Sequence, residues 1–197
     1  MKGAKSMVEF FSAMSAVDRF SQYRLVNPES VLEHTGMVAI MTMFICDQLD
    51  IGNAVELAAL RHALCHDMDE ILTGDICMPT KYHSPESKSM IDQIAHKNAI
   101  LIDQQYDIRI MHDWEGDGQD VFIVKLADVM AVFYKTYQEI ELFGNKTLIG
   151  ATSQLAKGLL KSYDNLDHMI QEVRTSNLRQ IVEEMIAWAE SMNEDKT

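Results

Sequence analysis

Four residues of this chain are of the types that bind a divalent metal ion, and they are spread over three separate stretches. They are His34, the adjacent pair His66 and Asp67, and Asp128. Apolar residues flank each of them at helical spacing; around Asp128, for example, these are Val124, Ala131 and Val132. An ionisable side chain among such neighbours is costly to bury unless a cation or hydrogen bonds compensate. The pattern therefore indicates that these groups face a shared partner inside the protein.

Two imidazoles and two carboxylates form a mixed nitrogen and oxygen ligand set. Such a set suits a borderline divalent ion such as Zn, Co, Mn or Fe and leaves positions open for water and substrate. A metal held in this way lowers the pKa of bound water and polarises a phosphoryl oxygen. We therefore predict one divalent metal site between helices. The alternative is a helical interaction module in which the same residues are hydrogen-bonded structural groups and bind no metal.

The elements that must position these residues are predicted to be helices. Apolar residues recur at helical spacing almost throughout, and no stretch alternates over strand length, so we expect an all-α fold. Ser30 and Glu33 form a capping-box pattern, and Ser84 before Pro85 marks another helix start. The predicted helices cover residues 7–17, 30–50, 53–71, 85–106 and 120–143, with a loop over 107–119 and two or three helices within 146–193. We expect residues 1–197 to form one domain.

Composition excludes several classes of protein. The chain has 197 residues, of which 47% are hydrophobic, and a formal net charge of −13, which argues against binding long nucleic acid. No apolar stretch approaches the roughly 18 residues of a membrane helix, so no membrane partner is expected. Three widely separated cysteines form no pairing pattern, which favours reduced thiols and a cytoplasmic location.

The order of these motifs resembles the HD-domain phosphohydrolase superfamily, and within it the YfbR-type 5′-deoxynucleotidases. The resemblance rests on Leu32-Glu33-His34, on His66-Asp67 followed by Glu70 and by Leu72-Thr73-Gly74-Asp75, and on Lys125-Leu126-Ala127-Asp128. Asp18-Arg19-Phe20 falls where the family has an arginine followed by an aromatic residue, and Pro79, Lys81 and Tyr82 also fit. The resemblance covers about residues 7–143, whereas the C-terminal helices at about 146–193 match only in kind.

The resemblance implies a role for each matching residue. His34, His66, Asp67 and Asp128 would hold the metal, and Asp67 and Glu70 would act in the hydrolytic step. Arg19 would bind phosphate, and Asp75 would accept a hydrogen bond from the sugar hydroxyl. Phe20 stands where the family usually has Trp, a residue associated with rejecting the ribose 2′-hydroxyl. The implied activity is hydrolysis of deoxynucleoside monophosphates to deoxynucleosides and phosphate, by a homo-oligomer (dimer or higher).

A second resemblance leaves the number of phosphates open. The phage HD proteins of the DatZ type, which remove triphosphate from dATP, have similar motifs at the same places. Lys81, and less readily Lys88, would then help to hold a longer phosphate chain, and magnesium could accompany a triphosphate substrate. A further alternative is a helical nucleotide-binding protein that keeps the motif geometry without turnover, although neither Glu70 nor any of the four metal ligands is missing.

Overall fold

The computed structural model describes residues 2–106, 118–170 and 177–194, and within these ranges it contains helices and no strand. The elements are α1 (Lys2–Ser15), α2 (Val31–Gln48), α3 (Asn53–Cys65), α4 (Glu70–Thr73), α5 (Met78–Lys81), α6 (Pro85–Tyr106), α7 (Gln119–Tyr137), η1 (Gln138–Leu142), η2 (Lys146–Ala151), α8 (Thr152–Met169) and α9 (Asn177–Glu194). The all-α prediction is confirmed.

The chain divides into two compact units, each built from separate stretches of sequence. The first unit takes its residues from 1–24, 28–36 and 65–114, and the second from 25–27, 37–64 and 115–197. Helix α2 contributes its first turns to one unit and the remainder to the other. The organisation of the chain as one domain stays a prediction. No helix in the described ranges is long and apolar enough to cross a membrane.

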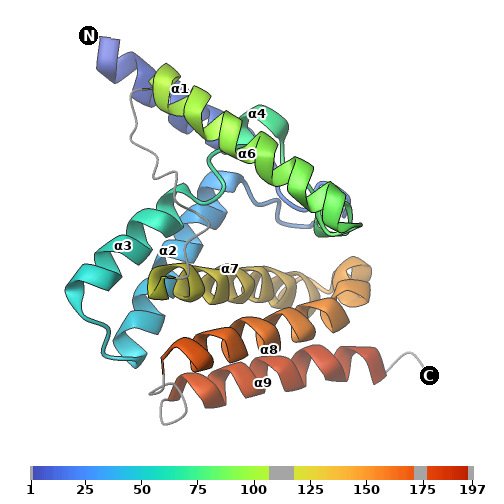
Figure 1. Cartoon of the computed structure of the whole chain (residues 1–197). Helices are drawn as coiled ribbons and strands as arrows, with labels where there is room; N and C mark the ends of the chain where they lie inside the picture. Colours follow the sequence, from blue (N-terminus) through green and yellow to red (C-terminus); the bar gives the residue numbers. More distant parts are fainter. Residues whose placement is uncertain (1, 107–117, 171–176, 195–197) are drawn as a thin grey trace. The chain divides into compact units, whose positions relative to one another are not determined.

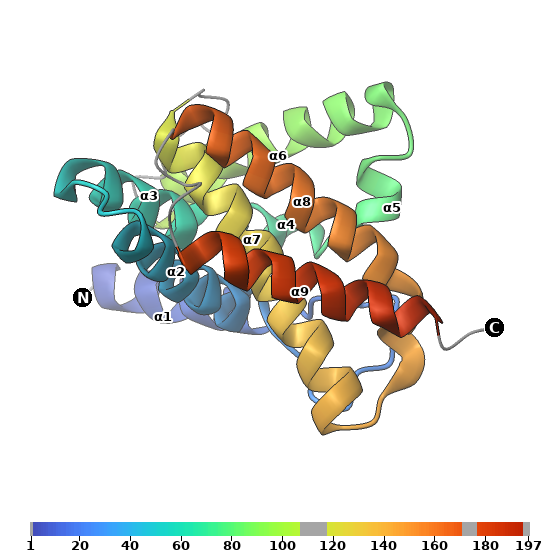
Figure 2. The ribbon, with the colours of Figure 1, turned by 90° about the horizontal axis from the view of Figure 1, so that it is seen from below.

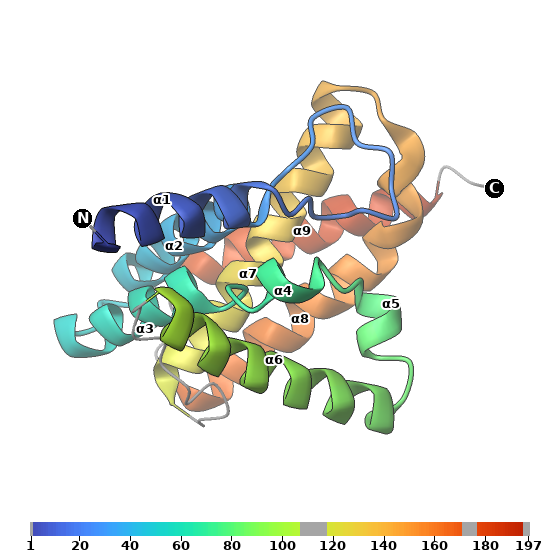
Figure 3. The same ribbon diagram turned by 90° about the horizontal axis from the view of Figure 1, so that it is seen from above.

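The first unit is centred on α1, α4 and α6. Phe10 and Met14 of α1 are almost fully buried and pack with Ala99 and Ile102 of α6. The rings of Phe10 and Tyr106 lie 5.3 Å apart between centroids, which joins the second half of α1 to the end of α6. Figure 3 shows the two short helices α4 and α5 along the path that leads into α6. This small core supports the segments that carry the chemistry.

The second unit contains the larger core. Helix α8 packs against both α7 and α9, and the three helices lie as neighbouring rods in Figure 1. Leu155, Leu159 and Leu166 of α8 are buried at helical spacing, because one apolar face of the helix meets its neighbours. Figure 2 shows α8 and α9 at an angle to each other, converging where α8 begins and α9 ends. Residues 38–63 of α2 and α3 contribute Val38, Ile45 and Ala63 to the same core.

Local signals located several helix ends correctly. Helix α6 begins at Pro85, and the Ser84 hydroxyl accepts a hydrogen bond from the Ser87 amide at 3.1 Å. The capping box at the start of α2 is present, since Glu33 Oε2 accepts from the Ser30 amide at 2.8 Å. Helix α7 begins at Gln119, one residue before the predicted start. Of the predicted loop 107–119, residues 107–117 lie outside the described residues.

The predicted helix over 53–71 is wrong at its end. Helix α3 stops at Cys65, residues 66–69 form a turn, and α4 follows from Glu70. The Met68 side chain, 8% exposed, joins the core of the first unit, and burial of Met68 is better served by a turn than by four more helical residues. The pair His66-Asp67 therefore lies in a turn and not on a helix, contrary to our prediction that helices present every ligand.

Candidate active site

The turn after α3 brings two potential ligands together. His66 Nε2 lies 3.1 Å from Asp67 Oδ2, and the turn is closed by a hydrogen bond from the Glu70 amide to the Asp67 carbonyl at 3.1 Å. Glu70 thus begins α4 directly beyond the pair. In a continuous helix, successive side chains point about 100° apart around the helix axis. Here the side chains of His66 and Asp67 lie within 3.1 Å of each other.

His34 reaches the same carboxylate from α2. Its Nε2 lies 3.7 Å from Asp67 Oδ2, and the side chain is fully buried. The rings of His34 and His66 have centroids 5.5 Å apart, and each offers a nitrogen within 4.8 Å of the other. The capping box one turn earlier fixes the start of α2 and so the position of this histidine. One aspartate oxygen therefore faces two imidazole nitrogens.

Sequence reasoning missed the residue on the far side of His34. Glu29 Oε2 lies 3.6 Å from His34 Nδ1, and Glu29 is itself 8% exposed. A carboxylate against the second ring nitrogen is the usual way in which a metal-binding histidine is oriented. Glu29 stands five residues before His34, outside any helical spacing, so the available signal was only an acidic residue close to the motif.

Arg19 places a cation beside these carboxylates. Its guanidinium forms an ion pair with Asp67, and Nη1 lies 3.9 Å from Glu70 Oε2. The Arg19 amide donates to the Glu29 carbonyl at 2.8 Å, so the backbone pairs here with the segment that leads into α2. A guanidinium is well suited to hold phosphate oxygens. In this structure it instead neutralises the Asp67 carboxylate.

The backbone of Phe20 is hydrogen-bonded to the side chain of Asp75. The Phe20 amide donates to Asp75 Oδ2 at 2.8 Å, and Phe20 has a φ of 56°, in the left-handed region that an aromatic residue rarely adopts. Asp75 follows Gly74, whose φ of 74° gives the chain the reversal after α4 that glycine permits. One oxygen of Asp75 therefore accepts a hydrogen bond from the backbone of Phe20.

Three carboxyl groups lie close together in this cluster, and their pKa values are shifted from the ordinary ones. Burial alone would raise the pKa of Asp67, but the neighbouring His66 imidazole and Arg19 guanidinium hold that pKa well below its ordinary value. Burial raises the pKa of Glu70 to about 9, and the negative charge of Asp67 acts in the same direction. Burial and the same charge raise the pKa of Asp69 to about 6. The site thus holds one ionised carboxylate beside one that keeps its proton.

The donor set fits a divalent cation. Two imidazole nitrogens and an ionised carboxylate oxygen lie together, which matches the mixed ligands of zinc-like sites. Glu70 Oε2 is buried and has no hydrogen-bond partner among the described residues, so it too would gain from a cation or a water held there. These are the features expected of side chains arranged for a metal.

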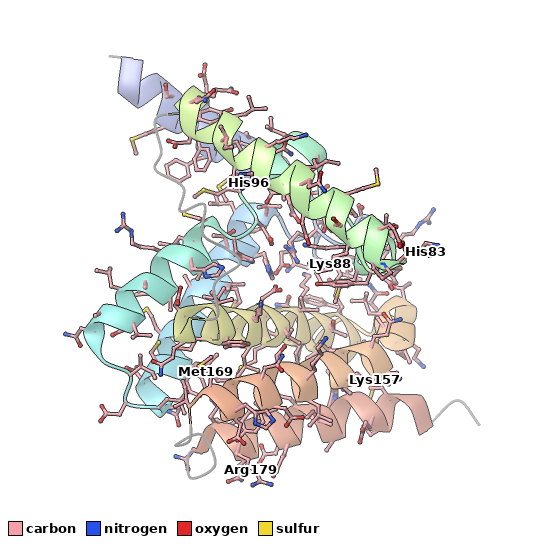
Figure 4. All side chains as sticks on the ribbon, in the orientation of Figure 1. His83, Lys88, His96, Lys157, Met169 and Arg179 are labelled. Carbon is pink, nitrogen blue, oxygen red and sulfur yellow. The ribbon has the colours of Figure 1, made fainter. Side chains whose placement is uncertain are left out.

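The remaining predicted residues are two lysines and Asp128. Lys81 is the last residue of α5, and its charge acts on the carboxyl of Asp69. Lys88, marked near the His83 end of α6 in Figure 4, pairs with Asp92 on an exposed face, which agrees with a solvated role. Asp128 belongs to α7 in the second unit, and its place among the metal ligands stays a prediction.

Comparisons with known proteins agree with these features. A 5′-deoxynucleotidase from Photorhabdus laumondii is 32% identical over 168 residues, covering 78% of this chain and 84% of that protein. One from Yersinia pestis is 30% identical over the same span. Among solved structures, an HD-domain phosphohydrolase from Listeria innocua superposes with a TM-score of 0.73 at 20% identity, covering 94% of this chain and 90% of that one.

A more distant structure has the same fold. The HD phosphohydrolase DatZ of cyanophage S-2L superposes with a TM-score of 0.58 at 16% identity, covering 96% of both chains. The family described as 5′-deoxynucleotidase YfbR-like matches residues 6–175, which include every predicted site residue. The chain therefore belongs to the YfbR-like 5′-deoxynucleotidase family.

Proposed function

We propose that this protein is a metal-dependent 5′-deoxynucleotidase, which hydrolyses deoxynucleoside monophosphates to deoxynucleosides and phosphate. The observation that carries the proposal is the cluster of Arg19, Asp67 and Glu70 beside two imidazoles, within a chain of this family. Curated relatives at 30% to 32% identity carry the same activity in their names. A phosphate-binding cation, metal-type ligands and a protonated carboxyl are the groups that this hydrolysis requires.

Arg19 would bind the substrate phosphate by exchanging partners. Its guanidinium now neutralises Asp67, and a phosphate would offer it two oxygens in the geometry of its paired N–H groups. Once Asp67 binds a cation instead, Arg19 no longer has to compensate that carboxylate. The arginine therefore positions phosphorus beside the ligand cluster, and its charge also stabilises the charge that develops on the phosphoryl oxygens.

The proposed metal ligands are His34, His66, Asp67 and Asp128. Asp128 is included because of its position in Lys125-Leu126-Ala127-Asp128. Glu29 would orient His34 through the second ring nitrogen. A divalent ion bound there would supply an activated water and polarise a phosphoryl oxygen. We propose zinc, cobalt or manganese as its identity, and the structure of DatZ was solved with one catalytic Zn²⁺ ion.

Glu70 would supply the proton that the leaving group needs. Hydrolysis forms a bond from water oxygen to phosphorus and breaks the bond between phosphorus and the 5′ oxygen, which must be protonated as it leaves. The raised pKa of Glu70, about 9, results from burial and from the charge of Asp67, and it keeps this carboxyl protonated near neutral pH. The second carboxylate oxygen of Asp75 would accept a hydrogen bond from the sugar hydroxyl, while the first holds the Phe20 amide.

A second activity, release of triphosphate from deoxynucleoside triphosphates, is favoured by one observation. Lys81 lies close enough to Asp69 to affect its pKa, which places a further cation in the first unit where a longer phosphate chain could meet it. DatZ, whose fold this chain shares, was solved bound to dA. Magnesium would be expected to accompany such a substrate.

The test is an end-point assay on full-length protein whose metal content has been measured. All deoxynucleoside mono- and triphosphates are supplied alongside the ribonucleotides, with Asp67→Ala as the inactive variant and Asp92→Ala, on the exposed face of α6, as the matched control. Free phosphate from monophosphates, lost in Asp67→Ala alone, supports the nucleotidase. Intact triphosphate as the product supports the second activity. Turnover that survives Asp67→Ala, or no turnover by metal-loaded protein, refutes both.

Two further properties belong to this proposal. We propose a homo-oligomer (dimer or higher), which light scattering on the purified chain would measure. We also propose a cytoplasmic location, in keeping with reduced Cys46, Cys65 and Cys77.

A further inference from the structure

A lysine and a glutamate are buried together where α7 passes into η1, in the second unit. Lys135 is 2% exposed and Glu139 is fully buried, with Lys135 Nζ 3.3 Å from Glu139 Oε1. Buried charges of this kind are costly and weak as stabilisers compared with apolar residues of the same volume. Their presence calls for a role other than filling the core.

Both charges are directed at one short piece of backbone. Glu139 accepts hydrogen bonds from the amides of Val26 and Asn27 at 2.8 and 2.9 Å, one on each carboxylate oxygen. The Lys135 ammonium donates to the Asn27 carbonyl. Asn145 completes the arrangement, because its side-chain amide donates to Glu139 Oε2 at 2.6 Å. We call Lys135, Glu139 and Asn145 the backbone clamp.

The segment that the clamp holds is the tip of the connection between α1 and α2. Residues 16–30 connect α1 to α2, and residues 25–27 within this connection belong to the second unit. Ser21, Arg24 and Val26 are exposed, so the tip of the connection contributes almost nothing to the core. Its base is closed by two backbone hydrogen bonds, from the Arg19 amide to the Glu29 carbonyl and from the Val31 amide to the Val17 carbonyl.

The connection carries groups of the active site on both of its arms. Arg19 lies on the outgoing arm, seven residues before Val26, and Glu29 lies on the return arm, two residues after Asn27. Glu29 faces His34 Nδ1, and Arg19 faces Asp67. The covalent chain therefore joins residues 26 and 27, which the clamp holds, to the arginine proposed to bind phosphate and to the carboxylate beside His34.

We infer that Glu139 is a positioning residue for hydrolysis: by fixing the tip of the α1–α2 connection it sets the position of Arg19 against the substrate phosphate. This inference rests on the proposed function. A carboxylate is required because two adjacent backbone amides need two acceptor oxygens at once, a need that neither an apolar side chain nor a carboxamide can meet. The low pKa of Glu139 is consistent with this: burial would raise it, but the hydrogen bonds from Asn145, Val26 and Asn27 lower it.

The variant Glu139→Gln tests the inference, because glutamine keeps the shape but replaces one acceptor oxygen with a donor. Full-length protein with its metal is assayed on deoxynucleoside monophosphates, alone and combined with Arg19→Ala. Asn145→Ala is the second, milder variant. Leu159→Ala, in the core of the same unit and remote from the clamp, is the control for loss of stability, and it is compared at matched fraction folded.

We expect Glu139→Gln to lower kcat/KM roughly tenfold to a hundredfold, mainly through KM, because a small displacement of a positioning group has effects of that size. The loss should disappear in the Arg19→Ala background. Amide hydrogen exchange of residues 17–31 should increase in Glu139→Gln and Asn145→Ala, but not in Leu159→Ala, and metal content should not change.

Two outcomes would overturn the inference. One is equal kinetics for Glu139→Gln and Leu159→Ala, and the other is faster exchange of the connection with KM unchanged. If the wild-type chain hydrolyses none of the monophosphates, the proposed function fails instead. The exchange measurement, which needs no substrate, still reports whether the clamp holds the connection.

Discussion

Glu139 in the second unit is fully buried, Glu70 in the first unit has a buried carboxyl oxygen, and the surroundings of these two glutamates are opposite. Glu139 accepts hydrogen bonds from two backbone amides and an asparagine and pairs with Lys135, so its pKa is lowered despite burial. Glu70 lies among other carboxylates, and its buried Oε2 accepts no hydrogen bond among the described residues, so its pKa is raised to about 9. A carboxylate that is fully satisfied by its own protein serves structure, whereas one left unsatisfied is available for chemistry with a ligand.

The largest expected effect is the loss of catalysis on substitution of Glu70. Glu70→Gln should reduce kcat by about 10² to 10⁴, because the proton for the leaving oxygen is lost, while stability changes by less than about 1 kcal/mol. Phosphate release and urea unfolding measure the two quantities. Glu86→Gln, on the exposed start of α6, is the control and should change neither. Retention of wild-type kcat by Glu70→Gln would remove Glu70 from the mechanism.

The second effect concerns folding. Lys135→Met should lower the free energy of unfolding by about 3–5 kcal/mol, because it leaves the Glu139 charge buried without its cation. Urea denaturation measures the loss. The matched control is Lys88→Met, which removes an exposed lysine that also pairs with an acid four residues later, and it should cost less than about 0.5 kcal/mol. Equal losses in the two variants would show that the clamp is no stronger than a surface pair.

The third effect is a dependence on pH. The folded-state pKa of Glu139 lies below its ordinary value of 4.5, so its contribution to stability is complete above pH 4.5 and is lost as the pH falls through the folded-state pKa. Wild-type stability should therefore decline more steeply below pH 4.5 than that of Glu139→Gln. Urea midpoints measured about one unit above and below that pH give the difference. Parallel curves for the two proteins would contradict the lowered pKa.

The smallest effect lies at the start of α2. Ser30→Ala should cost about 1 kcal/mol, because it removes the hydroxyl that caps the Glu33 amide. Metal affinity should not change, since the Ser30 carbonyl, which accepts a hydrogen bond from the His34 amide at 3.0 Å, is kept in the variant. Thermal unfolding and metal titration provide the two measurements. A loss of metal binding would mean that the cap, and not only Glu29, holds His34 in place.

Sequence predicted those parts of the fold that local signals determine. The capping box at Ser30 and the Ser84-Pro85 start of α6 were both located correctly, because side chain and backbone interact within one turn. The end of α3 at Cys65 was not, since apolar spacing continues to Ile71 and only the burial of Met68 shows that the chain turns. Lys135 and Glu139 are four residues apart, the spacing typical of an exposed helical pair, so nothing local indicates that they are buried.

The same limit applies to the candidate site. Motif order identified Arg19, His34, the His66-Asp67 pair and Glu70, which the structure places together. The sequence did not predict the contact between Glu29 and His34, because this contact depends on how the α1–α2 connection folds back. The link between Phe20 and Asp75, 55 residues apart, likewise depends on tertiary structure.

The interleaving of the two units along the chain has a consequence during synthesis. Every stretch of the first unit has been synthesised by residue 114, whereas α7, α8 and α9 of the second unit are still to be made. Until α7 is made, the apolar side chains of Val38, Ile45 and Ala63, which pack in the same core as α7, remain exposed. We expect the nascent chain at that length to be the stage most prone to aggregation and to chaperone binding.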